Sequence, residues 1–244
     1  MKQMKPARIL TVGSANMDMV LRMSRVPAAG ETMLDYTGGM VHIPGGKGAN
    51  CAVAAAKLGA SSLFCTRLGA DASGKQLYDT YTDYGVNTDY IKVDRTASTG
   101  LAVIMVEASG ANRIVVYPGA NRTLAVEDAA EALDSAPDAL CLQLEVPYEV
   151  TLGAARLAAA RGIPVILDAA PADRSLSFAE LPMLEIFSPN ESETEIYTGI
   201  TPTGADSCMR AARSSLTGGS ATSSPPSRSR RSIRLPQGMP LPPP

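Results

Sequence analysis

Residues 44–50 read Pro-Gly-Gly-Lys-Gly-Ala-Asn, and they lead directly into an alanine-rich stretch that ends at Gly59. The three glycines let the backbone approach a ligand closely and adopt positive φ angles. The helix expected over residues 48–58 adds free N–H groups and the positive end of its dipole at the same place. Lys47 brings a positive charge, and Asn50 can both donate and accept hydrogen bonds. This stretch predicts either a ligand-binding turn or a plain strand-to-helix connection.

The stretch fits neither of two common phosphate-binding motifs. Val41 stands where the first glycine of a Walker A loop is needed, and Gly48 follows Lys47 where that loop has Ser or Thr. Cys51 occupies the position of the last glycine in a Gly-x-Gly-x-x-Gly motif. The turn is therefore a glycine-rich loop of another kind.

Outward from this turn, short β-rich runs alternate with helical runs from about residue 8 to about residue 199. Such alternation predicts βαβ units, and therefore an α/β fold with a mostly parallel sheet between layers of helices. The expected strands are Arg8–Val12, Ser62–Thr66, Ala139–Leu144, Ile163–Leu167 and Leu184–Phe187, with a hairpin of Thr99–Glu107 and Arg113–Tyr117. The expected helices after residues 48–58 are Ser73–Tyr84 with Ser73 as N-cap, Leu124–Leu133, Pro147–Ala160 and Asn190–Tyr197.

Polar side chains follow four of the expected strands. They are Asn16 and Asp18 after the first strand, and Glu145, Asp168 and Asn190 after later ones. Because right-handed crossovers place ligand sites at the carboxyl ends of parallel strands, we expect these groups to converge on one edge of the sheet. Asn16 and Asp18 either form an Asx turn or bind a vicinal diol, since a carboxylate accepts hydrogen bonds and an amide does both. Asp168 lines the edge or caps a helix, and it is assigned no role.

Composition narrows the class of protein. With 244 residues, 45% apolar and 19% charged, the chain fits one soluble globular domain. No run approaches the roughly 20 apolar residues of a membrane helix, and the start shows no signal-peptide pattern, so a cytoplasmic protein is expected. The four cysteines form no Cys-x-x-Cys pair, which favours reduced thiols. The net charge of −2 combines an acidic body with six tail arginines, and an acidic body argues against a nucleic-acid partner.

The character of the chain changes near residue 207. Ser, Pro and Arg dominate from there, and the sequence ends Pro-Leu-Pro-Pro-Pro. This composition predicts a disordered tail over residues 207–244 after one domain over residues 1–206. The tail is either natural or the product of a reading-frame shift that replaced the rest of the domain, since the alternation stops abruptly.

Taken together, the motifs resemble the ribokinase-like (PfkB) carbohydrate kinase family in order and spacing across about residues 8–200. The resemblance rests on Gly13–Asp18, Gly30-Glu31-Thr32, Gly45–Asn50 with the helix after it, Ser98-Thr99-Gly100, Pro118-Gly119-Ala120-Asn121, Gln143-Leu144-Glu145 and Ser188–Glu193. The family implies a Rossmann-type three-layer sandwich with a small β lid, here truncated at its C-terminal end. The lid segments would be about residues 15–44 and 98–121.

The resemblance also implies roles for individual residues. Asn16 and Asp18 would hold sugar hydroxyls, and Glu145 would contact the sugar as well. The sugar would be enclosed from the other side by Gly45, Gly46, Lys47 and Asn50. Asn190 would lie near the ATP phosphates, and Glu193 would help to place Mg²⁺ through water.

The activity implied is ATP-dependent, Mg²⁺-dependent phosphorylation of a sugar, D-ribose first, on its primary hydroxyl to give ribose 5-phosphate. Adenosine, fructose or another sugar stays open as the substrate. In the ribose-phosphorylating members the lids pair between subunits, which implies a homodimer.

One departure from the family is serious. Its Gly-Ala-Gly-Asp run stabilises the transferring phosphoryl group and supplies the base that deprotonates the sugar hydroxyl, and this run does not occur in the chain. Thr203-Gly204-Ala205-Asp206 lacks the middle glycine and comes too early, and Gly69-Ala70-Asp71 fails likewise, so no catalytic residue is assigned. The adenine pocket and the monovalent-cation site belong to the missing part. We expect little or no activity, and the alternative is a non-catalytic sugar-binding or dimerising module.

Overall fold

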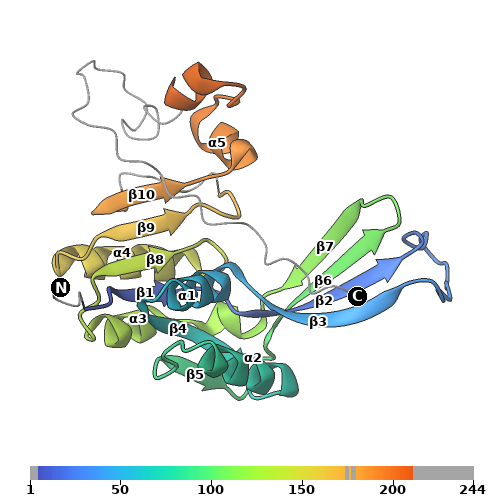
Figure 1. Cartoon of the computed structure of the whole chain (residues 1–244), viewed down its shortest axis with the longest axis horizontal. Helices are drawn as coiled ribbons and strands as arrows, with labels where there is room; N and C mark the ends of the chain where they lie inside the picture. The colour runs from blue at the N-terminus through green and yellow to red at the C-terminus, as the bar shows by residue number, and fades with distance from the viewer. Residues whose placement is uncertain (1–4, 174–175, 177–179, 211–244) are drawn as a thin grey trace.

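The computed structural model describes residues 5–173, 176 and 180–210. Its centre is a six-stranded sheet (Figure 1). The strand order is β10-β9-β8-β1-β4-β5, and every neighbouring pair is parallel. The strands are β1 (Arg8–Val12), β4 (Ser61–Gly69), β5 (Ile91–Asp94), β8 (Ala139–Leu142), β9 (Val165–Asp168) and β10 (Leu184–Ser188). The predicted parallel sheet is confirmed.

Helices cover both faces of this sheet. Alternate residues of β4 belong to different cores: Leu63 and Cys65 pack in one, and Phe64 and Leu68 in the other. The first core includes residues of α3 (Val126–Leu133) and α4 (Tyr148–Ala160), and the second includes residues of α1 (Lys47–Lys57) and α2 (Ala72–Asp83). Because successive strand residues point to opposite faces, the fold is the predicted three-layer sandwich.

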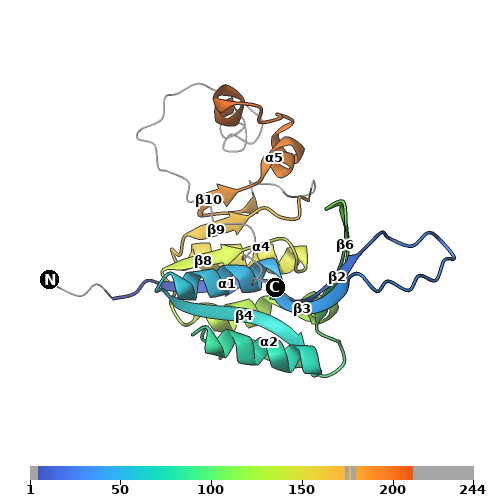
Figure 2. The same cartoon turned by 45° about the vertical axis from the view of Figure 1, so that its right-hand side comes forward.

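A second sheet, of four strands, forms the lid. It stands away from the main body (Figure 2). Its order is β3-β2-β6-β7, with strands β2 (Asn16–Met23), β3 (Gly39–Gly45), β6 (Gly100–Glu107) and β7 (Asn112–Tyr117). Only Gly13–Ala15 separate β1 from β2. Asn16 and Asp18 therefore lie on a strand, and the alternative of an Asx turn is wrong. Hydrogen bonding of β2 to both β3 and β6 holds them extended.

Two further predictions need correction. The N-cap of α2 is Asp71, because its Oδ1 accepts from Gly74 N at 2.8 Å, and Ser73 lies inside the helix. Residues 205–210 are helical, so the disordered tail expected from residue 207 does not begin there. Ser207 Oγ accepts from Thr203 N at 2.8 Å and satisfies a backbone donor at the start of this helix. Residues 211–244, which hold the rest of the expected tail, lie outside the described residues.

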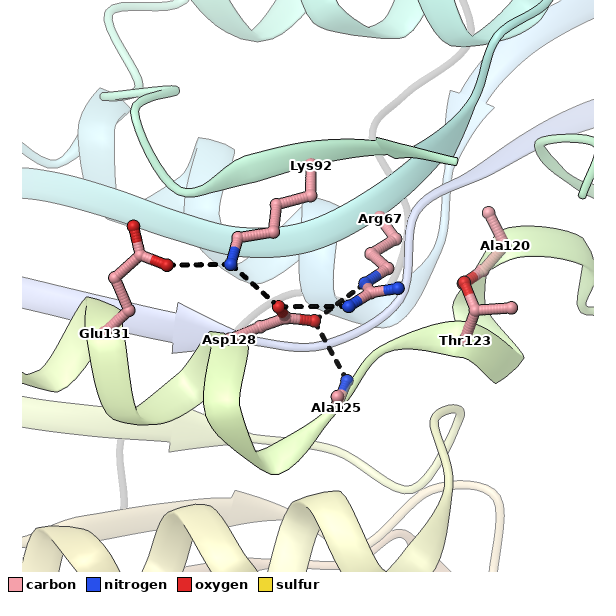
Figure 3. Close-up of polar contacts among 7 residues, drawn as sticks. All are labelled: Arg67, Lys92, Ala120, Thr123, Ala125, Asp128 and Glu131. Atoms are coloured by element: carbon pink, nitrogen blue, oxygen red, sulfur yellow. Dashed lines mark hydrogen bonds and ion pairs between the residues drawn. The ribbon is translucent and has the colours of Figure 1, made fainter. Parts of the chain in front are cut away.

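An ion-pair network fixes α3 against β4 and β5 (Figure 3). Asp128 is buried, and its carboxylate pairs with Arg67 Nε at 2.7 Å and Lys92 Nζ at 3.0 Å. It also accepts from Ala125 N at 3.0 Å, which caps the helix. Burial opposes ionisation of Asp128, but the hydrogen bonds from Arg67 and Lys92 outweigh it and hold its pKa below the ordinary value. The network thereby holds the chain just after η1 (Gly119–Thr123), a short 3-10 helix.

None of the helices in the described part of the chain is both long enough and apolar enough to cross a membrane.

Candidate functional site

The glycine turn and Glu145 are joined by hydrogen bonds at the carboxyl ends of β1 and β8. Ser14 Oγ donates to Glu145 Oε2 at 2.6 Å, and the Lys47 backbone N–H donates to the same oxygen at 2.9 Å. Gly48 N–H donates to Ser14 Oγ at 3.3 Å. The chain leaves β1 towards β4 on one side and returns to β8 on the other. This is a topological switch point, where open α/β sheets bind ligands.

Asn16 and Asp18 lie two residues apart on β2, so both side chains project from the same face of that strand. A Cβ added to Gly45 would lie 2.3 Å from Asp18 Oδ2, which shows that the carboxylate rests directly on the glycine turn. Burial raises the pKa of Asp18 to about 6, and the negative charge of Glu145 contributes to the rise. Asp18, Glu145 and the glycine turn therefore face one another, as the strand-end argument predicts.

Gly46 brings the turn close to the root of β2. Its φ is 92°, and a Cβ there would lie 2.9 Å from both Asn16 N and Ser14 O. The left-handed backbone and the close approach each require glycine. Gly45 and Gly46 thus shape the site through the absence of side chains.

Asp168, which sequence reasoning left without a role, ends β9 beside the same site. Burial raises the pKa of Asp168, the positive charge of Lys47 opposes that rise, and the charges of Glu193 and Glu145 add to it. The carboxylate therefore lies within electrostatic reach of both the expected sugar side and the expected nucleotide side. Its position at the end of an expected strand is the sequence feature from which a role in the site could have been predicted.

Asn190 and Glu193 form the start of α5 (Glu191–Thr198). Asn190 Oδ1 accepts from Glu193 N at 2.9 Å, and Glu193 Oε2 accepts from Asn190 N at 2.8 Å. This capping box satisfies two backbone donors and occupies one oxygen of each side chain. Within the described residues no three acidic, His or Cys side chains are grouped so that they could ligate a metal directly. A single carboxylate such as that of Glu193 still fits Mg²⁺, because this ion keeps several of its waters and takes its other ligands from substrate phosphates.

A cavity of about 610 Å³ opens beside Asn16 and Glu145. Its wall also includes Val116 at the end of the lid, Asn121 of η1 and Pro171 after β9. The volume suits a small ligand, because pockets for such molecules measure about 300–1,000 Å³. The wall of this cavity is thus built both from segments next to the main sheet and from the lid.

Asn50 is placed differently from the other predicted residues. It lies in the first turn of α1 with its side chain exposed, three residues after Lys47 and therefore on the same side of the helix. Its backbone N–H donates to Gly46 O at 2.9 Å. Among the described residues, no side-chain hydrogen bond joins Asn50 to Asn16, Asp18 or Glu145.

Comparison with known proteins gives consistent matches. The model of the pfkB family carbohydrate kinases matches residues 6–222. The ribokinase of Haemophilus influenzae is 39% identical over 208 residues, covering 84% of this chain and 67% of the relative. The deoxyribokinase of Salmonella typhi is 37% identical over 209 residues, with coverage of 84% and 67%.

The solved structure of Arabidopsis thaliana ribokinase complexed with ribose and ATP superposes with a TM-score of 0.76 at 31% identity. The superposition covers 88% of this chain and 70% of that one. The chain thus spans about two thirds of the length of the curated relatives it matches.

Proposed function

The chain belongs to the pfkB family of carbohydrate kinases, and from this premise we propose that it binds a pentose, D-ribose first, as the acceptor of a phosphoryl group from ATP. The observation that carries the proposal is the hydrogen-bonded unit of Ser14, Glu145 and the Lys47 backbone, beside which Asp18 rests directly against Gly45. A polyol fits such a site because carboxylates accept its hydroxyl protons and amides bind its oxygens.

Each predicted residue then has a chemical task. Asn16, Asp18 and Glu145 would hydrogen-bond the sugar hydroxyls, which orients the sugar and expels water. Gly45 and Gly46 would let the sugar lie against the backbone, and Lys47 and Asn50 would close that side. All of these tasks serve to position the sugar, and positioning dominates the catalysis of phosphoryl transfer.

ATP would supply the phosphoryl group and Mg²⁺ would neutralise its charge. Asn190 stands at the N-terminus of α5, where a helix dipole favours phosphate oxygens. Glu193 is buried in the first turn of the same helix and would bind the metal's water shell. The carboxylate of Asp168 interacts electrostatically with both Glu193 of this helix and Lys47, and we propose that it lines the path between the sugar and the nucleotide.

We propose that this chain binds the sugar but transfers phosphate slowly. The Gly-Ala-Gly-Asp run is absent from the sequence, and with it the base and the anion-stabilising amides. A general base contributes about 10²–10⁴-fold to rate, and one anion-stabilising donor about 10²–10³-fold. A sugar-binding module without turnover is therefore the second candidate, and the absent run is the observation that favours it.

The lid supports the proposal of a homodimer. All six residues of β7 are exposed, among them Ile114, Val115 and Tyr117, and Met40 and Val41 of β3 are exposed on the other edge strand. An apolar sheet edge of this kind favours pairing with a second sheet, and another copy offers the same surface with two-fold symmetry. Sedimentation velocity should show a dimer, and Val115→Lys should shift it to the monomer.

Titration calorimetry with D-ribose tests the proposed binding. Asn16→Ala and Asp18→Ala should each weaken binding by about tenfold or more, since each removes a hydrogen bond to the ligand. Asp79→Ala, at an exposed position of α2, is the matched control. Binding that survives both substitutions at full strength would reject the site. 2-Deoxy-D-ribose serves as the competing ligand, given the deoxyribokinase relative.

A coupled assay of ADP release separates the two candidates. Ribose-dependent turnover at a rate typical of kinases, about 1–100 per second, would contradict the proposal of slow transfer. Binding without turnover would favour the module.

A further inference from the structure

Asn121, in the Pro-Gly-Ala-Asn run, lies between the backbone of Ala15 and the side chain of Asn16. Its Oδ1 accepts from Ala15 N at 2.9 Å. Its Nδ2 donates to Ala15 O at 3.2 Å and to Asn16 Oδ1 at 2.7 Å. The side chain is 2% exposed, and both of its amide hydrogens have acceptors. Asn121 therefore has a complete set of partners, none of which is a ligand.

The backbone decides which way both amides point. Ala15 N–H is a donor only, so the atom of Asn121 that faces it must be the oxygen. The nitrogen of Asn121 is then the atom that faces Asn16, and a nitrogen with two hydrogens can only donate. The atom of Asn16 nearest to it must be the oxygen. The oxygen of Asn16 is thus turned towards Asn121, and its amide nitrogen is the group left for a ligand.

The surroundings hold this pair in place. A Cβ on Gly100 would lie 2.2 Å from Asn16 Oδ1 and 2.4 Å from Asn121 Nδ2, so the two amides rest directly on the backbone of β6. The turn that carries Asn121 is tied to the preceding loop, because Ala120 N donates to Ser98 O at 2.7 Å. After the turn, the Asp128 network fixes the chain (Figure 3). Pre-formed geometry of this kind costs little when a ligand binds.

We propose that Asn121 is a positioning residue that fixes the polarity of Asn16, so that Asn16 presents a hydrogen-bond donor to the cavity. Both residues line that cavity. The inference rests on the proposed function for its ligand: a sugar hydroxyl next to Asn16 accepts through its oxygen and is left to donate its proton to a carboxylate. Asn16 and Asp18 then form a donor and an acceptor at a fixed spacing, which selects the orientation of a diol.

The first test needs no ligand. In ¹⁵N-edited NMR of the full chain, the side-chain amide hydrogens of Asn121 should exchange with water at least about tenfold more slowly than those of Asn112, which is exposed at the start of β7. In Asn121→Asp the carboxylate at position 121 cannot donate, so the Asn16 amide should turn over and its own hydrogens should become protected. Equal exchange for Asn121 and Asn112 in the parent chain would overturn the proposal, whether or not any variant folds.

The second test is a double-mutant cycle read by calorimetry with D-ribose. Asn121→Ala should weaken binding by about tenfold, because the unpinned Asn16 amide loses its fixed donor. In the Asn16→Ala background the same change should weaken binding by less than about twofold, because its effect acts through Asn16. Independent, additive effects would refute the positioning role. Absence of ribose binding in the parent chain would count against the proposed function, and the exchange measurement would still decide the orientation.

Discussion

Replacing Gly45 by alanine tests the contact on which the site depends. A Cβ at this position would lie 2.3 Å from Asp18 Oδ2, 2.4 Å from its Cγ and 2.5 Å from its Oδ1. Carbon and oxygen atoms pack at about 3.5 Å, so the carboxylate must move by about 1 Å. Gly45 has no positive φ, so alanine there brings no backbone strain and the contact is the only cost.

The displacement translates into a large loss of binding. A shift of about 1 Å in a positioning group costs up to about 10²-fold, and loss of one charged hydrogen bond costs about 1.5–3 kcal/mol, or roughly tenfold to a hundredfold. We expect Gly45→Ala to weaken D-ribose binding by a factor in this range. Titration calorimetry at pH 7.5 measures it, with urea unfolding alongside to show that the variant is folded.

Gly39→Ala is the matched control, because Gly39 begins the same strand and no atom lies within 4 Å of a Cβ placed there. This substitution should leave ribose binding and the urea midpoint unchanged. If Gly45→Ala and Gly39→Ala bind ribose equally well, then Asp18 does not contact the ligand and the reasoning from the glycine turn fails.

Four further outcomes follow from charges and caps. Because burial raises the pKa of Asp18 to about 6, ribose affinity should fall as the pH drops from about 7.5 to 5, and Asp18→Asn should remove this dependence in calorimetry. The stability of the ligand-free protein should move the opposite way: the pKa in the folded state exceeds the ordinary 3.8, so urea midpoints should rise as the pH falls through about 6. Asp128→Ala should lower the free energy of unfolding by about 2 kcal/mol. This loss is smaller than the loss expected on breaking a fully buried ion pair, because Arg67 and Lys92 reach solvent. The control Asp79→Ala should change the free energy of unfolding by under about 0.5 kcal/mol. Asn190→Ala removes the N-cap of α5 and should cost about 1 kcal/mol in the same unfolding experiment; no loss would show that the cap is dispensable.

Much of the fold could be predicted because local patterns determine it. The alternation of β-rich and helical runs located β1, α1 and the parallel sheet, and the strand-end rule gathered Asp18 and Glu145 at one edge. The glycines at residues 45 and 46 predicted that the turn lies close to other groups, and the turn does lie against Asp18 and Asn16. These features depend on residues that are near one another in the sequence.

The rest depends on contacts between distant residues. Asn16 and Asn121 are separated by 105 positions, and no local pattern links them. The cap of α2 shows the same limit: Asp71 and Ser73 are both good caps, and the choice of Asp71 is supported by its second bond, from Thr99 N at 2.8 Å. Only the folded chain brings these partners together.

The strand β2 serves as a wall of the cavity at one end and as an arm of the lid at the other. Asn16 and Asp18 occupy its first and third positions, close to the joint with β1, while Met23 lies about 20 Å further along. A displacement at the tip would move the two polar side chains far less, because they lie next to the joint. Substitutions near the tip should therefore leave the groups that are proposed to bind the sugar in place.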